Sequence, residues 1–314
     1  MSPWLLWAVW TLCCRLLVTV EVGGDLSLGR GLGEAILAGG GRAGDANANT
    51  FFEPLRQHLR GTDLAIANLE GCVRKQPGPP ATRVRFDLSF PASSARALTM
   101  TGFNAFGMAN NHSGDRGREG FGATRDTLLS LGLHPIAGIE RINLHGTLLT
   151  VVALEYANWR QPHSWNASWV LDIDSQSQRV KWAQRVRQLA SDGPVIVFLH
   201  GGAEDCDTIQ DNEKLFHQEL RTAGAAGVFG HHPHRIKMSV MPDGYPSFIS
   251  LGSVMFDRRR SPDCFGLLVR LTFWAGTRVG MRVFPVHITS RAFRPLVWKQ
   301  SAFCQQSRST TEHR

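Results

Sequence analysis

Short apolar runs alternate with amphipathic helical patterns through most of this 314-residue sequence. Runs such as LLVTVEV (16–22) and PVIVFLH (194–200) are short and rich in β-branched residues, which is typical of buried strands. Apolar spacing in VKWAQRVRQLA (180–190) and EKLFHQELRTAG (213–224) predicts helices. This alternation predicts an α/β fold with a largely parallel sheet. The last strands lack intervening helices, so we expect that end of the sheet to pair antiparallel.

The predicted elements cover most of the chain. Strands are expected at 16–22, 63–70, 103–109, 147–155, 194–200, 227–230, 245–252, 265–273 and 281–288. Helices are expected at 51–59, 93–100, 118–132, 180–190 and 213–224, and the glycine-rich residues 30–48 are expected to form a loop. With no linker dividing the chain, we expect one domain over 16–300, preceded by an apolar leader or anchor at 1–15. A polar, flexible tail is expected at 301–314.

The N-terminal apolar run covers residues 3–14 and is shorter than the ~20 residues that a membrane span needs. It resembles the apolar part of a signal peptide, but no Lys or Arg precedes it. Three interpretations stay open: a weak signal or anchor, an extension ahead of the domain, or an additional buried segment. The first would place the domain in the cell envelope, outside the cytoplasm; the others leave it cytoplasmic.

The charge balance favours anionic partners. The net charge is +8, which suits phosphorylated substrates, acidic polymers, nucleic acid or anionic lipid, and also fits a basic surface without a dedicated partner. Lys and Arg are dispersed, without the aromatic-interleaved basic stripe of single-strand binders, so we expect no nucleic-acid partner. The six cysteines form no C-x-x-C pair, which disfavours a zinc ribbon or a thioredoxin-like site.

Side chains that can bind metal follow five of the predicted strands. In α/β sheets, ligands bind at the carboxyl ends of strands. A single His or Asp at such a place is more often a structural hydrogen-bonding group or a cap, but five strand ends at one edge of one sheet predict a metal site. Without thiolates, the set suits one or two ions of Mn, Zn or Fe. The candidates are Asp25, Asn68, Glu70, Asn111, His112, Asp115, His200, Glu204, His231, His232 and His234.

Two of these stretches have a spacing with a local physical reason. In an extended segment, residues two apart point to the same side, so His232 and His234 are expected to face one site, with Pro233 between them. The same period places Asn68 and Glu70 on one side. Gly230 is expected to allow close approach of a neighbouring backbone.

The order of these motifs resembles a known family. The succession GDLSLGR, NLE, ANNHSGDRGREG, HGGAE, GHHPH and SLGSVMFD, over residues 24–257, is similar to the bacterial CapA family of poly-γ-glutamate capsule synthesis proteins. Those proteins are built on the calcineurin-like metallophosphoesterase fold. The resemblance implies a four-layer αββα sandwich with a centre for one or two divalent metal ions at the strand ends.

The resemblance also implies residue roles. Asp25, Asn68, Glu70, Asn111, His200, His232 and His234 would bind metal, with Glu70 in the slot of a bridging carboxylate. Asn111, His112, Asp115 and His231 would serve catalysis, His112 by protonating the leaving group or neutralising the transition state, and His231 by facing the substrate or supporting the ligands. This chain departs from the pattern at three places: Ser27 replaces the imidazole of Asp-x-His, Gly201 replaces Trp after His200, and Ser253 replaces Asn.

Two functions follow from the resemblance and the charge. One is a metal-dependent hydrolase acting on a phosphoester, or on another ester or amide, in capsule synthesis. The other is a non-catalytic component that holds an anionic polymer such as poly-γ-glutamate. Either role implies capsule-assembly membrane proteins as partners.

Overall fold

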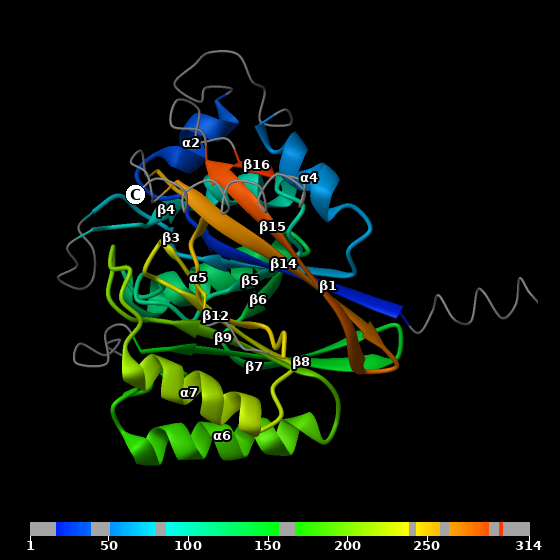
Figure 1. The fold of residues 1–314 in the computed structure, drawn as a ribbon. Coiled ribbons are helices and arrows are strands. Elements are labelled where there is room, and N and C mark those ends of the chain that lie inside the picture. Colours follow the sequence, from blue (N-terminus) through cyan, green and yellow to red (C-terminus); the bar gives the residue numbers. More distant parts are fainter. Residues whose placement is uncertain are drawn as a thin grey trace, which may run out of the picture.

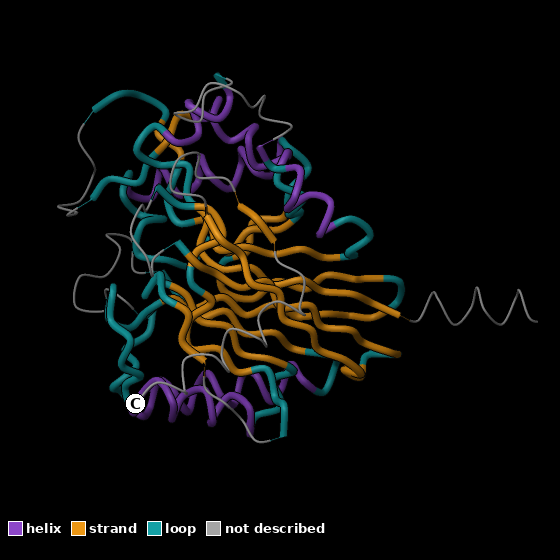
Figure 2. Tube along the Cα trace, turned by 45° about the horizontal axis from the view of Figure 1, so that its top comes forward, coloured by secondary structure: helices purple, strands orange, loops and turns teal. Residues whose placement is uncertain are grey.

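Two β-sheets lie face to face at the centre of the molecule, and helices cover their outer faces (Figure 2). The computed structural model describes residues 17–38, 51–78, 86–156, 167–238, 243–257 and 264–288, and the backbone of 295–297. The predicted leader at 1–15 and tail at 301–314 lie outside the described residues. The four-layer αββα sandwich implied by the resemblance is confirmed.

The first sheet has the order β16-β15-β14-β1-β2-β5-β6, and β13 pairs with β1. Strands β1, β2, β5 and β6 are mutually parallel, whereas β14, β15 and β16 are antiparallel, as predicted for that end. The bounds are β1 (Leu17–Leu26), β2 (Leu64–Leu69), β5 (Ala105–Gly107), β6 (His134–Ile136), β13 (Ser253–Met255), β14 (Phe265–Trp274), β15 (Thr277–Ile288) and β16 (Pro295–Val297).

The second sheet has the order β11-β12-β10-β9-β8-β7. Strands β8, β9, β10 and β12 are parallel, and the edge strands β7 and β11 are antiparallel to their neighbours. The bounds are β7 (Gly138–Leu144), β8 (Thr147–Glu155), β9 (Val195–His200), β10 (Gly227–His231), β11 (Ile236–Met238) and β12 (Ser247–Leu251). A short pair, β3 (Val73–Arg74) and β4 (Phe90–Pro91), lies outside both sheets.

The helices form the two outer layers. The first sheet is covered by α2 (Leu32–Leu37), α4 (Glu53–Leu59), the 3-10 helix η1 (Ala92–Met100) and α5 (Gly117–Ser130). The second sheet is covered by α6 (Gln176–Ala190) and α7 (Asp211–Thr222), which lie at the bottom of Figure 1. Among the described residues, no helix has both the length and the apolar character needed to cross a bilayer.

The alternation of side chains along β2 shows how the core is divided. Leu64 and Ile66 belong to the apolar cluster between the sheets, whereas Ala65, Ala67 and Leu69 pack against the helices on the outer face. Burial on both faces explains why LAIANL is almost wholly apolar. The same alternation places Asn68 and Glu70 on the inner face, beyond Leu64 and Ile66. The inner face of this strand is therefore apolar along most of its length and polar at its carboxyl end.

The predicted strands all occur, and so do the predicted helices, although 93–100 is a 3-10 helix. Helix α2 lies within the stretch expected to be a loop, because Leu32 and Ile36 are four residues apart and both reach the outer core. Strand β7 was also not predicted. It lies at a sheet edge, where the polar residues of GIERINL can alternate toward solvent.

Candidate metal centre

The candidate residues meet between the two sheets. The first sheet supplies five of them. Asp25 lies in β1, Asn68 lies in β2 and Glu70 directly follows β2, whereas Asn111 and His112 follow β5. His200 ends β9 and the His231–His234 segment ends β10, both in the second sheet. The expectation that one edge of one sheet supplies all of them is therefore wrong. The site is formed where the carboxyl ends of parallel strands from both sheets converge.

An irregularity in β1 turns Asp25 toward this site. Val22 pairs with Ile66 and Asp25 pairs with Asn68, so three residues of β1 advance against two of β2. Such a bulge reverses the alternation of side chains along the strand. Val22 faces the inter-sheet core, and the reversal lets Asp25, an odd number of residues later, face the same side. Gly23 and Gly24 lie between these two residues. The backbone packs closely here, since a Cβ on Gly24 would lie 2.1 Å from the Gly252 carbonyl oxygen.

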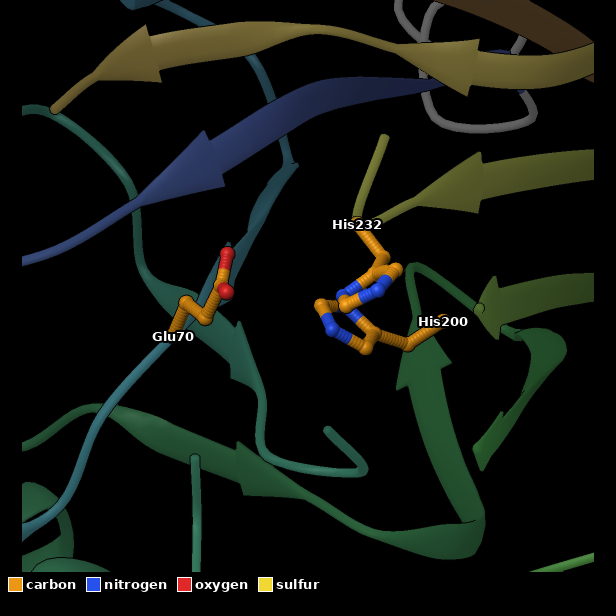
Figure 3. Close-up of side chains that lie close together, drawn as sticks. All are labelled: Glu70, His200 and His232. Atoms are coloured by element: carbon orange, nitrogen blue, oxygen red, sulfur yellow. The ribbon is translucent and has the colours of Figure 1, made fainter. Parts of the chain in front are cut away.

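Glu70 belongs to both groups of potential metal ligands found among the described residues. The first group is Asp25, Glu70 and His234, and the second is Glu70, His200 and His232. Within each group, one ligand atom per residue lies within 4.8 Å of the others. Figure 3 shows the rings of His200 and His232 close together with the Glu70 carboxylate facing them, and their ring centroids are 4.9 Å apart. A bridging Glu70 would require two donor groups that share its carboxylate; the bridging role itself stays a prediction.

The His232–His234 segment reaches the site by a turn. Strand β10 ends at His231, and both His232 (φ 94°) and His234 (φ 55°) have positive φ angles, which are uncommon outside glycine. The expectation of an extended segment is therefore wrong, although both rings do approach Glu70. The turn is held by the Asp25 carboxylate, which accepts a hydrogen bond from the His232 backbone N–H at 3.0 Å. Backbone strain concentrated at such a place is typical of functional sites.

A chain of hydrogen bonds links the two sheets through Asn68. Its Nδ2 donates to Asp25 Oδ1 (2.8 Å) and contacts His200 Nδ1 (3.1 Å). On the other side of the ring, His200 Nε2 lies 2.7 Å from Asn111 Oδ1. Because Asn68 Nδ2 is a donor, His200 accepts at Nδ1 and donates from Nε2 in this arrangement, and a metal bound at Nε2 would replace that proton. The Asn68 amide thus orients Asp25 and His200; its expected role as a metal ligand stays a prediction.

Electrostatics keeps the ligand atoms in the protonation states that metals require. Burial favours the neutral form of Asp25, but the hydrogen bond and the electrostatic attraction to His234 outweigh it and lower the pKa of Asp25. Burial, followed by the charge of His232, lowers the pKa of His200 well below its usual value. Asp25 is consequently ionised and His200 neutral at pH 7, the forms that bind cations.

His112 and Asp115 form a pair at the edge of the centre. His112 Nδ1 lies 3.0 Å from Asp115 Oδ2, and the buried Asp115 also accepts a hydrogen bond from the Leu88 backbone N–H at 2.8 Å. The other ring nitrogen, Nε2, faces Glu70 Oε1 at 3.9 Å. Asp115 therefore fixes the orientation of the ring, and His112 presents Nε2 to the site. Within this pair, both of which were predicted to serve catalysis, only His112 reaches the site directly.

His231 does not face the site as expected. Its side chain is 1% exposed, its Nε2 contacts the Gly23 carbonyl oxygen at 3.2 Å, and its ring stacks on Phe198 with centroids 5.0 Å apart. Burial lowers the pKa of His231, which keeps the ring neutral. His231 thus ties the second sheet to the first as a core residue, because its place in β10 gives it the same inward face as Phe229.

Two contributing residues were not among the predicted ligands. The buried Asn110 donates to Asn68 Oδ1 (3.2 Å) and the Leu69 carbonyl oxygen (2.8 Å), so it holds the loop after β5 against β2. Ser253, one of the departures from the family pattern, pairs in register with Asp25, and its Oγ lies 3.2 Å from His234 Nδ1. Their places in the ANNH and SLGS motifs are the signal that could have found them.

Comparisons with known proteins show the family and the fold of the chain. The model of the bacterial capsule synthesis protein family PGA_cap matches residues 19–258, which include every candidate ligand. The chain belongs to the PGA_cap family. PGA biosynthesis protein CapA of Bacillus subtilis (strain 168) is 23% identical over 224 residues, 67% of this chain and 58% of that protein. Capsule biosynthesis protein CapA of Bacillus anthracis is 23% identical over 263 residues, 77% of this chain and 60% of that protein.

The PGA_cap chain thus spans less than two thirds of either relative. Among solved structures, a hypothetical protein from Thermus thermophilus superimposes with a TM-score of 0.53 at 15% identity, covering 85% of this chain and 98% of that one. This likeness shows a shared fold. The calcineurin-like phosphoesterase YfkN from Bacillus subtilis superimposes with a TM-score of 0.45 at 11% identity, over 94% of this chain and 98% of the other.

Proposed function

We propose that this PGA_cap chain is a metal-dependent hydrolase that cleaves an anionic ester during the synthesis of a capsule polymer. The observation that carries the proposal is the shared carboxylate: Glu70 joins two groups of buried ligands, and His112 lies beside it. Neither group includes Ser27, so the imidazole missing from that position does not remove either.

The donor set fits divalent metal ions. It combines two carboxylates with three imidazoles and contains no thiolate, which suits Mn, Zn or Fe in a hydrolytic centre and not a structural zinc site. Asp25, Glu70 and His234 would hold one ion, and Glu70, His200 and His232, with Asn111 beside His200, would hold a second. A divalent cation bound there supplies Lewis acidity and an acidified water at neutral pH.

The chain's own residues handle the proton of the leaving group. His112 presents Nε2 to the site, and its Nδ1–H is directed to the buried Asp115 carboxylate. A protonated His112 can therefore give the Nε2 proton to a departing oxygen while Asp115 stabilises its charge. The arrangement also fixes which nitrogen faces the substrate, because the other is held by Asp115.

The substrate class and cellular role extend the family assignment. Two observations favour an anionic polymer or phosphoester substrate. The chain resembles capsule biosynthesis proteins, and its net charge is +8. As part of the same proposal, the protein acts in the cell envelope, with capsule-assembly membrane proteins as its partners.

The test combines metal content with activity. The purified full chain is freed of metal with a chelator, reloaded with Mn²⁺ or Zn²⁺, and assayed with bis-p-nitrophenyl phosphate and p-nitrophenyl acetate. His112→Gln should lower kcat about 10²–10⁴-fold while leaving the metal content unchanged. His134→Gln, an exposed histidine on β6, is the matched control and should retain full activity.

Metal loading without any hydrolysis by the wild type would overturn the hydrolase proposal. It would favour the alternative, in which the same fold holds an anionic polymer without cleaving it; binding of poly-γ-glutamate by the wild type and by His112→Gln alike would then be expected.

A further inference from the structure

The two ligand groups differ in chemical character. The Asp25–Glu70–His234 group has two carboxylates and one imidazole, whereas the Glu70–His200–His232 group has one carboxylate and two imidazoles. Ser27, which follows two residues after Asp25, offers only a neutral hydroxyl, and that hydroxyl accepts a hydrogen bond from the Gly29 backbone N–H at 3.2 Å. The first group therefore has three strong donors, fewer than the octahedral geometry of an oxygen-rich Mn²⁺ site accepts, so a further side chain can join it together with water.

Glu204 lies next to this group. Its Oε1 is 4.0 Å from His234 Nε2, the same nitrogen that lies 3.6 Å from Glu70 Oε1. Its side chain is 38% exposed, whereas those of Asp25 and Glu70 are buried. Glu204 is thus a partly exposed carboxylate that lies outside the buried group but close to the imidazole nitrogen of one of its members.

The loop that carries Glu204 is fastened to the histidine turn on both sides. The Gly201 backbone N–H donates to the His231 carbonyl oxygen (3.1 Å), and the Asp205 backbone N–H donates to the Pro233 carbonyl oxygen (3.2 Å). Gly201 packs against Tyr156 so closely that an added Cβ would lie 2.3 Å from the tyrosine ring. A larger residue at position 201 would therefore displace that ring. These contacts hold the Glu204 backbone beside the turn that presents His234.

We propose that Glu204 is a fourth donor to the ion held by Asp25, Glu70 and His234. The inference rests on the metal centre of the proposed function. With Glu204 this position has three carboxylates and one imidazole, an oxygen-rich set that suits Mn²⁺, while the position at His200 and His232 is richer in nitrogen and suits Zn²⁺.

The experiment isolates the first position and measures binding. His232→Gly removes an imidazole from the second position, and glycine suits the φ of 94° there. In this background, Glu204→Gln is compared with Asp211→Asn, which makes a similar change of charge at a fully exposed residue of α7. Each full-length protein is freed of metal and titrated with Mn²⁺, with free Mn²⁺ followed by electron paramagnetic resonance.

Glu204→Gln should weaken Mn²⁺ binding about tenfold or more and shift the preference toward Zn²⁺, whereas Asp211→Asn should bind as the background does. Thermal melting in chelator should be the same for both variants, which separates a lost ligand from a damaged fold. Equal Mn²⁺ affinity in the two variants would overturn the inference and leave the hydrolase proposal standing. Conversely, if Glu204→Gln weakens Mn²⁺ binding but the wild type hydrolyses no ester, only the hydrolase proposal is overturned.

Discussion

Gly230 allows strand β12 to lie against β10, just before the histidine turn. A Cβ added at this position would lie 1.9 Å from the Ile249 carbonyl oxygen and 3.1 Å from that of Phe248. Its φ angle is not in the positive range that favours glycine. A change of Gly230→Ala therefore tests the close approach of two backbones and not the conformational freedom of glycine.

The size of the effect follows from the geometry. A carbon and a carbonyl oxygen in contact are about 3.3 Å apart, so the added Cβ would force a separation of about 1.4 Å between neighbouring strands. That displacement overpacks the sheet and weakens the β10–β12 ladder, in which Phe229 pairs with Phe248. We expect Gly230→Ala to lower the free energy of unfolding by roughly 2–4 kcal/mol.

The assay is urea unfolding followed by circular dichroism in the presence of chelator, so that metal binding makes no contribution. Gly122→Ala is the matched control. Gly122 lies within α5, and an added Cβ there would meet nothing within 4 Å. Since alanine favours a helix, this variant should gain about 0.5–1 kcal/mol. If Gly230→Ala changes the unfolding free energy by less than about 0.5 kcal/mol, the inferred backbone contact is wrong.

Three further predictions concern buried titratable groups. Burial lowers the pKa of His217 to about 3. As the pH falls below about 6.5, the unfolded chain therefore binds a proton at this histidine, whereas the folded chain does not. The free energy of unfolding consequently decreases as the pH falls from 6.5 toward 3. His217→Gln should reduce the loss of unfolding free energy between pH 7.5 and pH 5 by about 2 kcal/mol in urea titrations at the two pH values, and equal losses would contradict this. Asp115→Asn should lower kcat about 30-fold, corresponding to about 2 kcal/mol for a charge-assisted hydrogen bond, with unchanged metal content; unaltered kcat would exclude the orienting role. Burial raises the pKa of the Cys72 thiol to about 12, so iodoacetamide at pH 8 should leave Cys72 unmodified in the native protein, as read by peptide mass spectrometry, and rapid modification would refute its burial.

The sequence predicted many side chains of the candidate metal centre because they lie in local motifs. Strand β2 shows why. Its alternating positions carry Leu64 and Ile66 into the core and then Asn68 and Glu70 into the site, a pattern that needs no long-range information. The HHPH segment shows the limit of such reasoning. An extended conformation was expected, but His232 and His234 adopt positive φ angles because the turn is held by Asp25, which lies more than two hundred residues earlier.

The sequence by itself determined the α/β class, the places of nine strands along the chain and the kinds of candidate ligand at their carboxyl ends. These depend on periodicity and on residue type, which are local properties. Only the tertiary structure decided that the ligands come from two facing sheets, that His231 is a core residue, that Asp115 acts on His112, and that Glu204 lies beside His234. Each of these depends on which strands become neighbours and on one bulge in β1, and both are set by packing between residues far apart in the chain.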